Sequence, residues 1–173
     1  MKDDTGSRVD ARRSRLSPLL AAAILLIIMP AISQAAEPAH LLRDFGRDQI
    51  IIDASSLRCI VLDVYIADTS EQRRNGLMHV ESMDINEGMV FIYSQPAEIS
   101  MWMKNTLIPL DMLFFDTSLR IKHIHRNAVP HSEAIISSNG PVIGVIELNG
   151  GAAELFGILP GDRIILPSAT SAD

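Results

Sequence analysis

The chain has 173 residues, of which 47% are hydrophobic and 21% charged, and its formal net charge is −6 at pH 7. An acidic chain without a basic stripe repels phosphate backbones, so nucleic-acid binding is disfavoured. The one cysteine, Cys59, has no partner for an internal disulfide. It adjoins Ile60 in an apolar segment, and we expect its thiol to be buried and inert.

The first 35 residues have the layout of a secretory signal peptide. Four arginines lie between residues 8 and 15, an apolar run follows at 19–32, and Ser33-Gln34-Ala35 offers a cleavage site. The run is shorter than the ~20 residues of a spanning helix. We expect cleavage near Ala36 and a periplasmic or secreted protein. The alternative is an uncleaved anchor, the only contact with a membrane that we expect.

The mature chain fits one domain. Of the 15 Lys+Arg and 21 Asp+Glu, five basic and three acidic residues precede Ala36, which leaves 10 and 18 and a charge of about −8. Its length, 173 less 35 residues or 138, suits a single core. Residues 36–48 are expected to be a flexible leader, 49–168 the domain and 169–173 a tail.

The domain is predicted to be mainly β. Cys59 to Ala67 alternates with period two, as a strand does. Thr69 and Gln72 form a capping box for a helix over 70–75, and 151–156 predicts a second one. Many short strands with two short helices favour a two-sheet sandwich or a partly closed barrel. The further strands are expected at 89–93, 99–104, 111–116, 120–127, 142–148 and 163–166.

Five motifs in order resemble the bacterial and archaeal domain of unknown function 192 family. They are Gln72-Arg73-Arg74-Asn75-Gly76-Leu77-Met78, Gly88-Met89-Val90-Phe91, Trp102-Met103-Lys104-Asn105-Thr106 with Pro109-Leu110-Asp111, Glu147-Leu148-Asn149-Gly150-Gly151 and Gly161-Asp162. The match covers roughly 51–166. The resemblance implies a mainly-β domain, often secreted, with no established activity, substrate or cofactor. His79 and Val80 stand where the family usually has an aromatic residue and an arginine.

A charged residue in the apolar segment 101–111 is the first candidate for function. Lys104 needs a partner or a ligand, because an unpaired buried charge is costly. If strands lie side by side, it can pair with Asp111 or Glu147, while Asn105 and Asn149 satisfy loop backbones. We favour a structural ion pair; the alternative is an acid–base pair with a shifted pKa.

Four other features have structural explanations. The six methionines from Met78 to Met112 suit copper(I), but core filling is favoured. Trp102 is either core or the wall of a groove, and we expect it to be mostly enclosed. His123 and His125 lack a fixed third metal ligand, so we read them as a solvated strand face. We expect Arg73 to stabilise the carbonyl end of the 70–75 helix and favour this role over one in a pocket.

Together these residues predict a non-enzymatic binding or interaction module. Its ligand would be a small polar molecule, a peptide end or a saccharide, or its partner an extracytoplasmic protein. No metal or cofactor is expected. The alternatives are an enzyme that uses Lys104 with Asp111 or Glu147, and a periplasmic copper-handling protein. The candidate groove residues are Trp102, Lys104, Asn105, Asp111, Glu147, Asn149 and Arg73.

Overall fold

The computed structural model describes residues 39–54 and 58–166. The predicted signal peptide, residues 1–35, and the predicted tail, residues 169–173, lie outside these ranges. The elements are α1 (Ala39–Asp44), β1 (Gly46–Ala54), β2 (Arg58–Ala67), α2 (Ser70–Asn75), β3 (Glu87–Met101), β4 (Leu110–Phe115), β5 (Ile121–Ala128), β6 (Ile136–Asn149), α3 (Ala152–Leu155) and β7 (Arg163–Ile165).

The strands and helices differ from the prediction in several places. The expected leader 36–48 contains α1 and the start of β1, although its sequence shows no periodicity. The strands expected at 89–93 and 99–104 are one strand, β3, which ends at Met101. Lys104 therefore lies in a turn beyond the strand. The described chain has three short helices, α1 in addition to the two expected.

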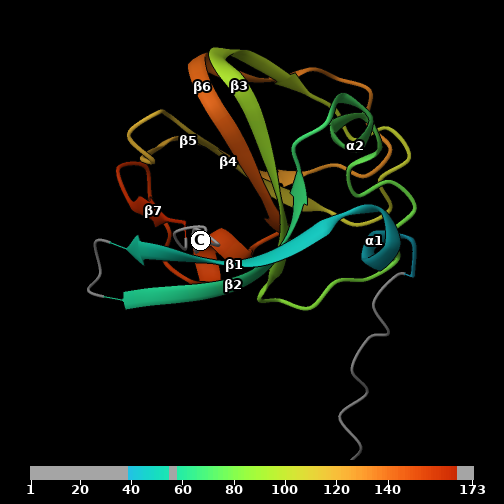
Figure 1. Cartoon of the computed structure of the whole chain (residues 1–173), viewed down its shortest axis with the longest axis horizontal. Coiled ribbons are helices and arrows are strands. Elements are labelled where there is room, and N and C mark those ends of the chain that lie inside the picture. The colour runs from blue at the N-terminus through green and yellow to red at the C-terminus, as the bar shows by residue number, and fades with distance from the viewer. Residues whose placement is uncertain (1–38, 55–57, 167–173) are drawn as a thin grey trace, which may run out of the picture. The chain divides into compact units, whose positions relative to one another are not determined.

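All seven strands belong to one sheet, in the order β5-β4-β6-β3-β2-β1-β7. The β2–β3 pair is parallel and the other pairs are antiparallel. The sheet curls into a half-barrel (Figure 1), and an isolated bridge between Arg120 and Arg163 joins β7 to the start of β5. The mainly-β prediction is confirmed, while the two-sheet sandwich is not.

The core has one apolar cluster on each face of the sheet, because alternate side chains of a strand point to opposite faces. Tyr65, Met89 and Phe91 belong to one cluster, which includes Leu41 of α1. The other cluster includes Leu62, Val64 and Val90, with Ala152 and Ala153 of α3. The period-two pattern predicted for 59–67 is therefore correct, and the later part of the strand is buried on both faces, with Leu62 and Val64 on one and Tyr65 and Ala67 on the other.

The parallel β2–β3 pair requires a crossover, and residues 68–86 with α2 provide it. Helix α2 has the predicted capping box: the Thr69 side chain accepts from the N–H of Gln72, and the Gln72 side chain bonds the N–H of Thr69. Across 39–54 and 58–166, no helix is long and apolar enough to span a membrane.

Candidate functional site

A small pocket lies between the crossover and the end of β3, with a volume of about 30 Å³. That volume holds one or two waters, or a single small polar group. The pocket receives side chains from α2, from the turn after Met101 and from β6. Its lining residues are Arg73, Arg74, Asn75, Gly76, Leu77, Met78, Phe91, Met101, Trp102, Lys104, Thr106 and Glu147.

Glu147 is the buried polar group of this pocket. In β6 it pairs with Met89 of β3 and Met112 of β4, and only 4% of its surface is exposed. The strands approach closely here: a Cβ added to Gly88 would lie 2.5 Å from the carbonyl oxygen of Glu147. This contact leaves little freedom in the backbone that carries the carboxyl group.

The carboxyl group of Glu147 has no hydrogen-bond or ion-pair partner among the residues that the structure describes. Burial without compensation disfavours the charged form and raises the pKa of Glu147 to about 8. The group is therefore mainly protonated at neutral pH. A protonated carboxyl both donates and accepts a hydrogen bond, so it can serve a ligand in either role.

Lys104 does not form the predicted structural ion pair. Within the described ranges, no carboxylate lies within 4.0 Å of its ammonium group. Its Nζ instead lies 5.3 Å from the centre of the Trp102 ring, a cation–π contact. Trp102 is 43% exposed, so the expectation that it is mostly enclosed is wrong. Trp102 is the first residue after β3.

Arg73 and Arg74 reach the pocket because α2 ends beside it. The guanidinium of Arg73 donates to the carbonyl oxygens of Asp68 and Ile92, the latter at 2.8 Å, and lies 4.9 Å from the centre of the Tyr93 ring. Arg73 therefore has a structural role as well as a place in the lining. Arg74 is exposed and donates to no group in the described part of the chain. It is the more available cation.

Asp111 is not in the pocket. Its neighbour Met112 is the residue that pairs with Glu147, so Asp111 faces the other side of the sheet. Its carboxylate accepts from the N–H of Asn127 at 2.8 Å and from the N–H of Ala153 at 2.9 Å. Asp111 is fully buried and links β4 to the end of β5 and to α3. The predicted pairing of Lys104 with Asp111 is wrong.

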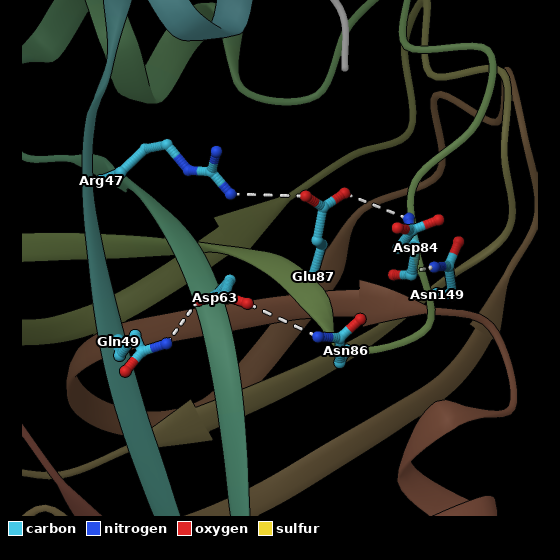
Figure 2. Close-up of polar contacts among 7 residues, drawn as sticks. All are labelled: Arg47, Gln49, Asp63, Asp84, Asn86, Glu87 and Asn149. Carbon is cyan, nitrogen blue, oxygen red and sulfur yellow. Dashed lines mark hydrogen bonds and ion pairs between the residues drawn. The ribbon is translucent and has the colours of Figure 1, made fainter. Parts of the chain in front are cut away.

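Asn149 is also outside the pocket. Its side chain donates to the carbonyl oxygens of Met83 and Asp84, each at 2.9 Å. The Asp84 N–H donates to Glu87, which also accepts from Arg47 (Figure 2). This network holds the end of the crossover against β6, which is a structural role.

Asn105 lies at the edge of the site rather than in its lining. Its backbone has φ 56°, and its carbonyl oxygen accepts from the N–H of His79 at 2.9 Å. The side-chain amide of Asn105 donates to the sulfur of Met78 at 3.8 Å. Asn105 thus joins the two loops that border the pocket.

Several residues that line the pocket were not among the predicted groove residues, and Arg74 and Thr106 are two of them. The motif Arg73-Arg74-Asn75-Gly76 signals a helix end, but it does not show which arginine is left without a structural partner. Thr106 is 6% exposed and lines the pocket together with Glu147.

The other candidate clusters are structural in the described chain. Met89, Met101, Met103 and Met112 are buried in the core cluster on the Glu147 face, and Met83 packs against it. His123 stacks on Phe114 with 5.7 Å between ring centres. Residues 39–54 and 58–166 contain no group of three His, Cys, Asp or Glu residues placed to hold a metal. Cys59 is exposed, contrary to expectation.

Comparisons with known proteins support the fold. The model of the DUF192 family, described as Uncharacterized ACR, matches residues 51–166. A crystal structure from Sinorhizobium meliloti 1021, provisionally described as a transcription regulator, is 43% identical, with a TM-score of 0.69; the match covers 70% of this chain and 95% of that one. A protein of unknown function from Novosphingobium aromaticivorans DSM 12444 is 35% identical, with a TM-score of 0.67 and coverage of 69% and 84%. No protein with a curated description matches the chain.

Proposed function

This chain belongs to the DUF192 family, an uncharacterised family, and we propose from its pocket that it is a binding module for a small polar ligand. The pocket around Glu147, Lys104, Arg74 and Trp102, called the Glu147 pocket below, takes one polar group of that ligand. On the pattern of residues 1–35, we place the protein outside the cytoplasm.

The single observation that carries the proposal is the buried, unpartnered carboxyl group of Glu147. Buried polar groups are normally hydrogen-bonded. Glu147 is only 4% exposed and has no hydrogen-bond partner in the described chain, so its carboxyl group depends on water or a ligand in the pocket. Burying a carboxyl group in this way is costly, and a leucine of similar volume would avoid the cost. Proteins commonly accept such costs where a site must be ready for a ligand. Glu147 also lines an open pocket, which a group serving only the core would not need.

The charges around the pocket favour a ligand with an anionic or hydrogen-bond-accepting group. Arg73, Arg74 and Lys104 carry positive charge, while Glu147 is mainly neutral at pH 7 because burial raises its pKa to about 8. The pocket is thus locally positive on a chain whose formal net charge is −6. A cationic group would meet three like charges there.

Catalysis by Glu147 is a second candidate. A carboxyl with a pKa of about 8 remains protonated at neutral pH and is able to act as a general acid. Lys104 is placed to act with Glu147 as an acid–base pair, because both side chains line the pocket. Asp111 is unsuited to this role, since it faces the opposite side of the sheet.

The proposal is tested with simple probes and one matched pair of variants. Melting temperature and tryptophan fluorescence are followed as acetate, methylammonium or glucose is added. We expect a saturable response to acetate that is lost in Glu147→Leu and kept in Glu154→Leu, which alters an exposed carboxylate of α3. A response that persists in Glu147→Leu, or none from any probe, would contradict the proposal. Chemical conversion of a bound probe, abolished in Glu147→Gln, would favour the enzyme.

A further inference from the structure

Next to the Glu147 pocket, two loops expose large apolar side chains. Trp102 is 43% exposed, Leu107 37%, Val129 67% and Ile135 66%. We call these four residues the Trp102 surface. Solitary exposed apolar residues are ordinary on a protein, but a group of them beside a polar pocket marks an interaction site.

The two loops are held together by the backbone. The N–H of Met103 donates to Ser132 at 2.9 Å, and the N–H of His131 donates to Thr106 at 3.1 Å. Met101 of β3 pairs with Ile136 of β6 in antiparallel register. Trp102 follows Met101 and Ile135 precedes Ile136, so these two exposed residues lie close together at the end of the β3–β6 ladder. Because Trp102 also lines the Glu147 pocket, the Trp102 surface adjoins that pocket.

Size and charge limit what enters the pocket. About 30 Å³ admits one group, so the rest of any ligand lies outside, on the neighbouring surface. Lys104 and Arg74 are cations without a carboxylate partner in the described chain, and the protonated Glu147 can donate a hydrogen bond. A carboxylate has two oxygens and meets both kinds of donor at once.

The Trp102 surface favours a chain of amino acids over an acyl chain. Its apolar residues are interrupted by polar ones, including Asn105 and Ser132, which offer partners to a peptide backbone. An acyl chain has no polar groups to satisfy and needs a continuous apolar sleeve, whereas this surface is open. Side chains on successive residues suit separate apolar positions.

We propose that the ligand is the carboxyl-terminal end of a polypeptide whose last residues are apolar. Its terminal carboxylate enters the Glu147 pocket between Glu147 and the cations Lys104 and Arg74, and its apolar side chains lie on the Trp102 surface. This inference rests on the proposed binding function and specifies the ligand of that same site.

The test uses Trp102 itself as the reporter, since it is the only tryptophan in the chain. The full chain is titrated with acetyl-Ala-Ala-Val-Leu as the free acid, with the same peptide as its carboxamide, with octanoate and with acetate. We expect the free acid to change the fluorescence saturably and the carboxamide to bind at least about tenfold more weakly, because a charge-assisted contact is lost.

Variants separate the pocket from the surface. Lys104→Met and Arg74→Met should each lower the affinity for the free acid by about tenfold. Lys122→Met, on β5, is the matched control and should leave that affinity unchanged. Ile135→Ser should lower the affinity for the peptide but not the affinity for acetate. Melting curves of each variant establish that it is folded.

Four results would overturn the inference. Equal affinity for acid and carboxamide, or tighter binding of octanoate than of the peptide acid, rules out a peptide carboxyl end. If only acetate binds, and its binding is lost in Glu147→Leu, the inference of a peptide ligand is also overturned, but the proposed polar-ligand site is not. Absence of any Glu147-dependent response to all four probes overturns both this inference and the proposed function.

Discussion

Asp111 and Glu147 lie on opposite faces of one sheet, although β4 and β6, which carry them, are direct neighbours. The register pairs Met112, not Asp111, with Glu147. One carboxyl group therefore faces the pocket without a protein partner, and the other is fully bonded to backbone N–H groups. Two buried acids that look equivalent in the sequence have different chemistry.

Asp111 should be a stability residue. Asp111→Asn replaces one accepting oxygen with a donor, so the N–H of either Asn127 or Ala153 loses its partner. We expect the free energy of unfolding to fall by about 1–3 kcal/mol. Urea unfolding followed by circular dichroism measures this. Acetate binding to the Glu147 pocket should be unchanged, and a loss of binding in a folded Asp111→Asn protein would contradict the assignment.

Glu147 should make stability depend on pH. Its pKa rises from 4.5 when unfolded to about 8 when folded, so the folded state holds the extra proton between these values. The stability that comes from this bound proton is fully present below pH 4.5 and is lost as the pH rises toward 8. Compared with Glu147→Gln, the natural chain should lose about 1.4 kcal/mol per pH unit in this window.

Unfolding curves of both proteins at pH 5, 6, 7 and 8 test this prediction. The other titratable or charged groups that line or adjoin the pocket are Arg73, Arg74, Lys104 and Tyr93. Burial raises the pKa of Tyr93 above its ordinary value of 10, so its hydroxyl stays neutral throughout. Parallel pH profiles for the two proteins would mean that Glu147 is ionised in the fold.

Lys104 should contribute little to stability. It is half-buried, and in the described structure its charge is met by the face of Trp102 rather than by a carboxylate. Lys104→Met keeps the length of the side chain, and we expect the free energy of unfolding to change by less than about 1 kcal/mol. A loss of ~3–5 kcal/mol, as for one member of a buried ion pair, would contradict this.

Asn149 should control the order of the loop that precedes β3. Asn149→Asp keeps the shape of the side chain but removes both donated hydrogen bonds and adds a charge beside two carbonyl oxygens. Figure 2 shows the bond to Asp84. We expect faster amide hydrogen exchange across residues 80–86, measured by mass spectrometry, with little change in β5. Unchanged exchange in that loop would exclude the anchoring role.

Cys59 should react in the native protein. Because it is exposed near the start of β2, a maleimide reagent should add one label per chain without denaturant. Cys59→Ser is the control and should take up none. If labelling required unfolding, the thiol would be buried, as we expected from its apolar neighbours in the sequence.

Local signals in the sequence were sufficient for the mainly-β class and for α2. The Thr69–Gln72 capping box is a contact between residues three apart, so the sequence contains both partners. The alternation in 59–67 likewise reports a strand, since period two is a property of the strand itself. Both features need no knowledge of the distant chain.

The site depended on long-range pairing. Sequence placed Lys104, Asp111 and Glu147 in one cluster, but only the β4–β6 register sends Asp111 to one face and Glu147 to the other, because a shift of one residue exchanges the faces. The tertiary structure likewise ends β3 at Met101 and leaves Trp102, the next residue, exposed. The sequence shows which residue types are present. Only the tertiary structure determines which of the two carboxyl groups has no protein partner.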